Sequence, residues 1–308
     1  MGKNRSLFQQ FNYAINNNFF EGTDKHADKK ENGSAMQEKI YSYTSLNNLK
    51  DFAKNFSNFT KENYPEVRNI NDVKEEHLQG FLNQKNTDGC TQNTLDMYKN
   101  NFNKLENVVN STFKTCNWDY KDKVVTPTSQ KQYDPNRGAA NPISKGDLDK
   151  ILDYCKENRS GSGDALITQA AIGVRVEELA QLKVKNVDLE NGKLHLDNTK
   201  GGKAMERTIT DDIRDILKEN IEGKDPEEKV FGVASSSINK QLNRIQDKLG
   251  LDKHSNHDIR RRLAQNKFNE CRNAGLSKQE ALDTISKWLN HGANRNDLLA
   301  KSYVANIW

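Results

Sequence analysis

The chain has 308 residues, which is long for one domain and comfortable for two, at about 100 to 200 residues per domain. Hydrophobic residues make up 34% and charged residues 29%, so the sequence can form hydrophobic cores beneath a strongly polar surface. The net charge of +4 is too small to indicate nucleic-acid binding by itself.

The sequence does not favour a membrane protein or a metal-binding protein. No run approaches the roughly 18 apolar residues of a membrane-spanning helix, and the N-terminus lacks the apolar core of a signal peptide. We therefore expect a soluble, cytoplasmic protein with no membrane partner. Cys90, Cys116, Cys155 and Cys271 lie far apart without a Cys-x-x-Cys pair, which argues against a zinc site or a disulfide scaffold. No acidic cluster has metal-ligand spacing, so we expect neither a metal nor another cofactor.

The first half of the chain carries helical patterns. A helix is predicted over 4–19, but residues 20–34 are charged, contain glycine and have few apolar side chains. We therefore expect 1–34 to be an N-terminal tail or an accessory arm. Further apolar periodicity predicts a helix over 36–63 and two shorter helices after it, the last beginning at Thr91 or Asn93. These helices predict a small all-helical domain over 35–121.

Residues 122–142 contain three prolines with Thr, Ser, Asn and Gly, and they have few apolar side chains. That composition predicts an interdomain linker. A second domain is then expected over 143–308.

The second domain is predicted to be mainly α with a small antiparallel β-sheet. Ser144 caps its first helix, Ser160-Gly161-Ser162-Gly163 predicts a turn, and a buried helix runs over 165–172 to Gly173. Short strands bounded by glycine-containing turns are predicted at 187–189, 193–196 and 207–209. Helices are predicted to follow at 211–221, 235–249, 257–272 and 277–289.

Arg175 lies in an apolar stretch between Gly173 and Leu179. A buried guanidinium needs either a carboxylate or a bound anion, because an unpaired buried charge is costly. Glu178, three positions on, offers the structural alternative of a helix-surface ion pair with Arg175. The segment alone leaves both interpretations open.

Lys200 falls between two predicted strands, so it is expected on the tip of a hairpin with flanking glycines. A lysine on such a tip can reach into a groove and give a proton to a leaving oxygen. Most lysines in such turns are only solvated, and Lys203 competes for the same role.

His257 and Arg260 are three positions apart at the start of a predicted helix, so both side chains project from one face. A helix N-terminus also favours bound anions, which suits a phosphate. The surrounding segment, 253–278, carries seven Lys or Arg against two acidic residues, a local net of +5. Taken singly, His-x-x-Arg is a common pattern, and His291 and Tyr303 are each compatible with simple packing.

In order and spacing, these residues resemble the tyrosine recombinases, the family of the phage integrases, Cre and the Xer proteins. Gly173-Val174-Arg175 opens a segment similar to the family's first arginine box, and His257-Asp258-Ile259-Arg260 matches its His-x-x-Arg box. Lys200 stands where the hairpin lysine is expected, Trp288-Leu289-Asn290-His291 resembles the Leu-Gly-His box, and Tyr303 stands at the place of the nucleophile. The catalytic resemblance covers about 143–308. The preceding helical domain looks like the family's SAM-like core-binding domain, which implies a two-domain DNA clamp.

Three features depart from the family pattern. Asn290 replaces the usual glycine before His291, and twelve positions separate His291 from Tyr303, a few more than is typical. Arg261 and Arg262 follow the second arginine, where the family often has histidine, and we expect them to add charge near the DNA.

The resemblance implies a site-specific recombinase or integrase of a phage or mobile element. Its catalytic residues would be Arg175, Lys200, His257, Arg260, His291 and Tyr303. Tyr303 would attack a DNA phosphate to give a 3′-phosphotyrosine, and Lys200 would protonate the leaving 5′ oxygen, without ATP or a metal.

The implied partners are a double-stranded DNA recombination site and three further copies of the chain in a homotetramer. Accessory DNA-bending proteins are an optional further partner. Ile307 and Trp308 are candidates for a short contact in trans. Two alternatives stay open: a DNA-binding regulator without cleavage activity on the same scaffold, and a type IB topoisomerase-like enzyme with the same chemistry.

Overall fold

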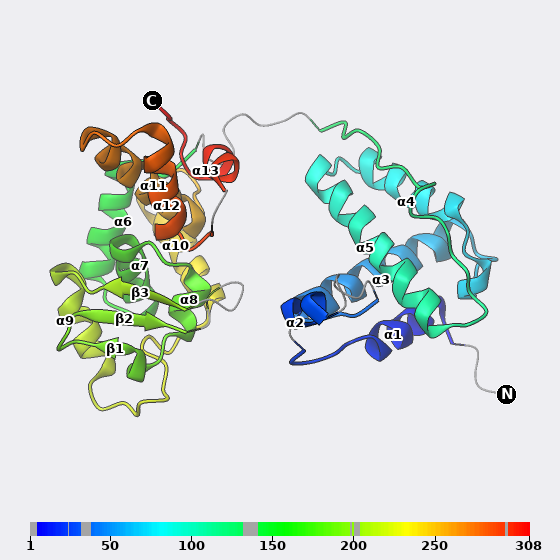
Figure 1. Cartoon of the computed structure of the whole chain (residues 1–308), viewed down its shortest axis with the longest axis horizontal. Helices are drawn as coiled ribbons and strands as arrows, with labels where there is room; N and C mark the ends of the chain where they lie inside the picture. The colour runs from blue at the N-terminus through cyan, green and yellow to red at the C-terminus, as the bar shows by residue number, and fades with distance from the viewer. Residues whose placement is uncertain are drawn as a thin grey trace. The chain divides into compact units, whose positions relative to one another are not determined.

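The computed structural model divides the chain into two compact units, Met1–Tyr133 and Asp134–Trp308, and each has its own hydrophobic core (Figure 1). The structure describes residues 5–23, 25–31, 38–131, 141–197, 199, 204–292 and 295–308. No helix in these ranges is long and apolar enough to cross a membrane. In these ranges the molecule is mainly α-helical with one small antiparallel sheet, as predicted.

The first unit is all-helical in its described part. Its elements are α1 (Leu7–Asn17), α2 (Lys25–Glu31), α3 (Tyr43–Asn63), the 3-10 helix η1 (Ile70–Asp72), α4 (Glu75–Thr87) and α5 (Gln92–Thr112). Aromatic rings dominate its core: Phe81 packs edge-on against Phe52 and Phe56, with ring centroids 5.7 and 5.8 Å away. Thr91 caps α5, because its side chain accepts a hydrogen bond from the backbone of Thr94.

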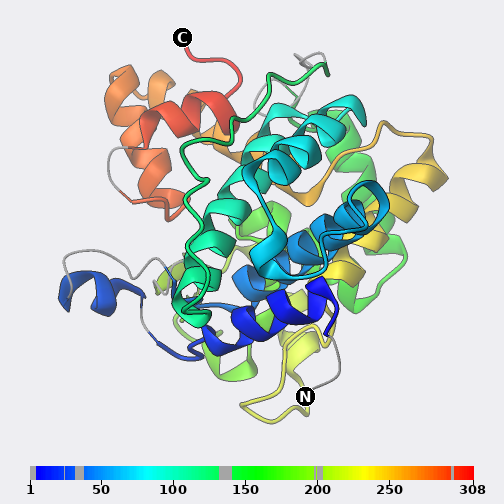
Figure 2. The ribbon, with the colours of Figure 1, turned by 90° about the vertical axis from the view of Figure 1, so that its right-hand side faces the viewer.

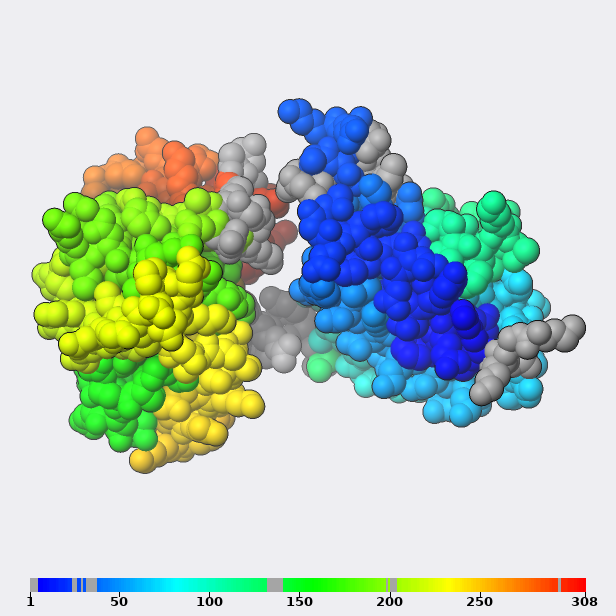
Figure 3. Space-filling model, turned by 90° about the horizontal axis from the view of Figure 1, so that it is seen from below, coloured from blue at the N-terminus to red at the C-terminus, as the bar shows by residue number. Residues whose placement is uncertain are grey.

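The N-terminal segment differs from the expected tail. Ser6 and Gln9 form a capping box that starts α1, and Phe11 and Ile15 of this helix are fully buried. The helix contacts α3 and α5, and its dark blue residues lie against the body of the first unit (Figures 2 and 3). The prediction of a tail over 1–34 is therefore corrected for α1, which supplies part of the core.

Two further boundaries in the first unit are corrected. The helix predicted from residue 36 begins at Tyr43, because Ser42 caps it and Ile40 instead bonds to the backbone of Asn18. The first part of the expected linker packs on the first unit: Val124 is buried, and the Val125 backbone N–H donates to Gln79 Oε1 at 2.8 Å. Apolar burial and main-chain hydrogen bonds thus hold residues that composition alone assigned to a linker. Residues 132–140 lie outside the described ranges.

The second unit contains both helices and the sheet. Its helices are α6 (Lys145–Glu157), α7 (Gly161–Ile172), α8 (Val176–Gln181), η3 (Val184–Asn186), α9 (Asp211–Ile221), α10 (Ser235–Leu249), α11 (Asn256–Asn273), α12 (Lys278–Trp288) and α13 (Asn296–Ser302). Its strands are β1 (Val187–Asp188), β2 (Lys193–Leu196) and β3 (Met205–Thr208), which pair antiparallel in the order β1-β2-β3. Figure 1 shows α11, α12 and α13 gathered on one side of the unit.

The turn predicted at 160–163 is instead the first turn of α7. Ser160 caps the helix, because its Oγ accepts a hydrogen bond from the Gly163 N–H at 3.1 Å. Gly161 is required at this place, since a Cβ there would lie 2.5 Å from the carbonyl oxygen of Phe231. The glycine therefore permits close packing of the helix start rather than a bend of the chain.

Candidate active site

Arg260 is the largest fully buried side chain among the described residues, with 1% of its surface exposed. Its Nη1 donates to the carbonyl oxygen of Gly173 at 2.8 Å, and its Nη2 donates to that of Leu289 at 2.6 Å. Its Nε has no hydrogen-bond partner in the described part of the chain. Burial, followed by the charge of Arg175, lowers the Arg260 pKa to about 10. A bound anion would stabilise this cation by charge and would give its Nε an acceptor.

Arg175 is the N-cap residue of α8 and is bound to Glu178. Its backbone N–H and its Nη1 donate to the two carboxylate oxygens of Glu178, each at 2.8 Å. The ion pair considered from the sequence is thus present, but it is not a surface pair, because the Glu178 side chain is only 4% exposed. Since Glu178 also lies 4.0 Å from Arg260, one carboxylate faces two guanidinium groups. The site therefore keeps an excess of positive charge.

His257 is the second residue of α11 and lies against Tyr303. The two rings meet nearly edge to face, with centroids 4.9 Å apart. Burial, and then the charges of Arg261 and Arg260, lower the His257 pKa to about 4. The imidazole is therefore neutral near pH 7 and able to accept a proton.

Tyr303 and His291 come together although twelve positions separate them. The intervening chain contains α13, which ends at Ser302 and brings the buried Tyr303 ring to 4.8 Å from the His291 ring. Part of this interval thus forms a short helix. Asn290 has φ of 57°, and asparagine tolerates this left-handed conformation better than most residues other than glycine. Both departures from the family pattern therefore have a local structural reason.

Three of the predicted residues share a hollow of about 200 Å³: Arg175, His257 and Arg260. Gln169 and Asn256 also line it, and both side chains are almost fully buried. Gln169 Oε1 and Asn256 Oδ1 have no hydrogen-bond partner within the described ranges. Unpartnered buried polar atoms around one hollow are typical of a site that is completed by a ligand or by water.

Lys200 and the competing Lys203 lie outside the described residues. The nearest described neighbour is Thr199, which is buried and whose Oγ1 accepts a hydrogen bond from Asn290 Nδ2 at 2.9 Å. The residue before Lys200 is thus bound to the residue before His291.

Arg207, on the inward-facing side of β3, is a further arginine of this region that the sequence did not identify. Its Nε donates to the carbonyl oxygen of Ile172 at 3.2 Å, its Nη2 donates to that of Trp288, and its guanidinium lies 5.4 Å from the centre of the Trp288 ring. Burial lowers the Arg207 pKa. Arg207 and Arg260 therefore bind consecutive carbonyls at the ends of α7 and α12. The sequence placed Arg207 only at the start of a predicted strand, and its position opposite Leu194 follows from the sheet register.

The guanidinium groups of Arg261 and Arg262 both donate to backbone carbonyls, and the charge of Arg261 lowers the pKa of His257. Arg261 Nε donates to the carbonyl oxygen of Ser302 at 2.8 Å, and Arg262 Nε donates to that of Ile143 at 2.6 Å. Both guanidinium groups are engaged in contacts within the second unit. Their acceptors are backbone carbonyls far away in the sequence, which no local pattern identifies.

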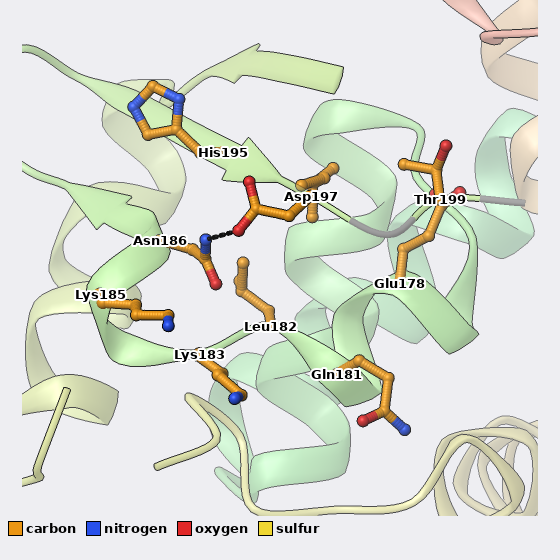
Figure 4. Close-up of a pocket in the computed structure, with 10 residues that line it drawn as sticks. Glu178, Gln181, Leu182, Lys183, Lys185, Asn186, His195, Asp197 and Thr199 are labelled. Atoms are coloured by element: carbon orange, nitrogen blue, oxygen red, sulfur yellow. Dashed lines mark hydrogen bonds between the residues drawn. The ribbon is translucent and has the colours of Figure 1, made fainter. Parts of the chain in front are cut away.

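A larger hollow, of about 380 Å³, lies beside α8, η3 and β2. Figure 4 shows Asn186 and Asp197 pointing toward one another there, and Asn186 Nδ2 donates to Asp197 Oδ2 at 2.7 Å. It shares Glu178 with the arginine pair but contains none of the described predicted catalytic side chains. In the described part of the chain no group of three or more His, Cys, Asp or Glu side chains is placed to hold a metal ion.

The helical unit, with its three-stranded sheet, its buried Arg260 and its partly buried Arg175, has the architecture of a tyrosine recombinase catalytic domain. Residues 142–291 match the phage integrase family. Residues 142–291, nearly half of the chain and most of the second unit, are therefore similar in sequence to this family and to a curated tyrosine recombinase.

Individual relatives agree with this family. The tyrosine recombinase XerA of Saccharolobus solfataricus is 30% identical over 148 residues, which are 47% of this chain and 46% of XerA. The match thus spans about half of the relative's length. A lambda integrase tetramer bound to a Holliday junction has a TM-score of 0.61 at 12% identity, over 94% of this chain and 78% of that one. The Tn1549 transposon integrase with a circular intermediate DNA has a TM-score of 0.57 at 12% identity, over 96% and 94%. These two likenesses concern the fold.

Proposed function

We propose that the chain is a site-specific DNA recombinase that cuts and rejoins DNA through a 3′-phosphotyrosine intermediate, and that it serves a phage or another mobile element. The observation that carries the proposal is the packing of the Tyr303 ring against His257 and His291, with centroids 4.9 and 4.8 Å away. His257 also shares its hollow with Arg175 and Arg260. These contacts support the proposal that a nucleophile, two histidine rings and two cations act together on one phosphate.

The two arginines would bind the scissile phosphate. Arg260 uses two of its five N–H groups on backbone carbonyls, and its Nε is directed to no acceptor within the described ranges. Arg175 uses one side-chain N–H on Glu178, so further donors remain for a phosphate oxygen. Charge that develops on the nonbridging oxygens in the transition state is stabilised by such fixed donors.

The cleavage step would exchange one oxygen–phosphorus bond for another. The Tyr303 oxygen bonds to phosphorus while the bond from phosphorus to the 5′ oxygen breaks. The tyrosine proton passes to the neutral imidazole of His257 or to His291, and Lys200 gives a proton to the departing 5′ oxygen. Because the phosphotyrosine ester retains the bond energy, the 5′-hydroxyl of a partner strand can reverse the step without ATP.

The proposed partners are duplex DNA and further copies of the chain. The lambda integrase structure named above is a tetramer on a Holliday junction, and the two compact units here suit a clamp of the kind that the sequence predicted. We extend this to a homotetramer, with accessory DNA-bending proteins as an optional addition.

Covalent capture on DNA tests the proposal. A duplex selected by the protein from a randomised pool is rebuilt with a nick beside the cleavage position, so that the cut end diffuses away and the adduct accumulates. We expect an adduct with the wild-type protein and none with Tyr303→Phe. Binding without any adduct would favour the DNA-binding regulator, and an adduct that persists in Tyr303→Phe would exclude Tyr303 as the nucleophile. Relaxation of supercoiled DNA lacking a selected site would favour the topoisomerase.

The choice between the two lysines is tested with the same duplex. Lys200→Ala is expected to slow cleavage, and a 5′-phosphorothiolate substrate is expected to restore it, because its leaving group needs no proton. If Lys203→Ala shows this rescue and Lys200→Ala does not, Lys203 is the proton donor.

A further inference from the structure

One face of α11 holds the chain on both sides of Tyr303 through its backbone. Arg261 Nε donates to the carbonyl oxygen of Ser302, the residue before Tyr303, at 2.8 Å. Gln265, one turn further along α11, binds Asn306 twice: its Nε2 donates to Asn306 O at 2.9 Å, and its Oε1 accepts from Asn306 N at 2.8 Å. The segment that carries Tyr303 is thus bound to the same helix that carries His257.

The end of the chain continues along α11. Arg272 Nε donates to the carbonyl oxygen of Trp308 at 2.9 Å, and its guanidinium lies 5.2 Å from the centre of the Trp308 ring. The Trp308 Nε1 donates to Asn269 Oδ1 at 3.2 Å. Ile307 packs against the core beneath α11 and α12. The last residues, which the sequence suggested for a contact in trans, are therefore docked in cis in this structure.

The guanidinium of Arg261 is itself fixed at two ends. Its Nη1 donates to Asp258 Oδ1 at 2.5 Å, while the other oxygen of Asp258 accepts from the backbone and the hydroxyl of Ser255 at the start of α11. Arginine presents its donors in a rigid planar fork, so a guanidinium held by Asp258 can aim Nε at one backbone position. The hydrogen bond from Arg261 to Ser302 is therefore suited to fix the backbone position directly before Tyr303.

We propose that Arg261, assisted by Gln265, is a positioning residue that holds the Tyr303 side chain in the active site of its own protomer. The inference rests on the proposed function, since it assigns how the proposed nucleophile is delivered. The hydrogen bonds at Ser302 and Asn306 restrain the backbone before and after Tyr303. A misplacement of about 1 Å at a reacting atom can slow a reaction on the order of 100-fold, so loss of either restraint acts on the chemical step.

The test measures the rate of adduct formation on a nicked half-site that binds one protomer, at saturating DNA. The dissociation constant of each variant for the same DNA is measured separately. Arg261→Ala and Gln265→Ala are expected to slow adduct formation about 10- to 100-fold while the dissociation constant changes less than about threefold. Arg261→Lys retains a charged donor and is expected to recover part of the rate. Lys267→Ala is the matched control, because it removes a positive charge from α11 that makes no hydrogen bond or ion pair with residues 302–308. Its adduct rate should equal that of the wild type.

The outcomes separate this inference from the proposed function. If the wild type forms an adduct that depends on Tyr303, and Arg261→Ala and Gln265→Ala form it at the wild-type rate, the positioning role is overturned and the proposed function stands. If the wild type forms no such adduct, both fall. Circular dichroism identifies a variant that does not fold. If Arg261→Ala does not fold, the inference is overturned when Arg261→Lys and Gln265→Ala both form the adduct at the wild-type rate.

Discussion

The two units use their interiors in different ways. The first unit is filled by aromatic rings such as Phe52, Phe56 and Phe81. The second has a mainly aliphatic core that also encloses the guanidinium of Arg260 and leaves Gln169 Oε1 without a partner in the described ranges. A buried polar atom without a hydrogen bond costs about 1 to 3 kcal/mol. The contrast indicates that packing is the main role of the first interior, whereas the second interior loses stability where a ligand is expected.

The largest effect is expected from the aromatic core of the first unit. Phe56→Ala should lower the unfolding free energy of that unit by about 3 to 5 kcal/mol, because it removes a fully buried ring. Hydrogen exchange followed by mass spectrometry should show faster exchange in α3 and α5, with protection of α7 unchanged. Equal loss of protection in α7 would mean that the units unfold together and that the comparison between them fails.

A glycine pair tests the packing of the second unit around its site. Gly173 and Gly250 both end helices in the left-handed conformation, with φ of 68° and 63°. A Cβ at Gly173 would lie 2.2 Å from the Trp288 ring, whereas a Cβ at Gly250 meets nothing within 4 Å. Gly250→Ala should therefore cost about 1 to 2 kcal/mol of unfolding free energy, and Gly173→Ala about 1 to 3 kcal/mol more.

Urea unfolding of the two variants measures that difference. Gly173→Ala should also slow DNA adduct formation, because Trp288 directly precedes the segment that leads to His291. Gly250→Ala should leave adduct formation unchanged. Equal destabilisation by the two substitutions would contradict the close contact with Trp288.

The smallest effect concerns His257 and pH. Burial and the charges of Arg261, Arg260 and Arg175 depress its pKa to about 4 from an ordinary 6.5, although Asp258 opposes them. Between these values the unfolded chain binds a proton that the folded chain does not, so the unfolding free energy falls as pH drops through this window. Above pH 6.5 the group has no effect on stability.

The pH effect is measured by comparing the wild type with His257→Gln. The loss of unfolding free energy between pH 7 and pH 5 should be smaller in the variant, by less than about 2 kcal/mol after solvent screening. An equal loss in both proteins would show that His257 protonates normally in the folded state.

The sequence was most informative where a signal is local. Apolar periodicity and capping residues such as Thr91 predicted several helices to within a few residues. They could do so because the apolar residues on the buried face of a helix recur at a regular spacing in the sequence. The chain order of the motifs also selected residues that are close in space, since the rings of His257, His291 and Tyr303 meet. The fold class followed from the same local signals together with the family resemblance.

The errors came from long-range contacts. The periodicity of α1 shows that the helix has an apolar face but not that this face meets α3 and α5. Gly161 has the composition of a turn, and only the nearby carbonyl of Phe231 explains why a helix start needs it. Arg207 and Arg261 donate hydrogen bonds to backbone carbonyls. Because every residue has a backbone carbonyl, the sequence does not identify which residues accept these hydrogen bonds.

Trp288 has a practical consequence that follows from its surroundings. Its ring touches the position of Gly173 and lies under the guanidinium of Arg207, at the end of the helix that leads to His291. Indole fluorescence responds to nearby charge and polarity, so rearrangement of these groups should change the emission of the unlabelled protein. Trp308 is half exposed and Trp118 is buried in the first unit, so replacing both by Phe would leave one optical reporter inside the second unit. Assembly of the site could then be followed in real time, before any DNA strand is cut.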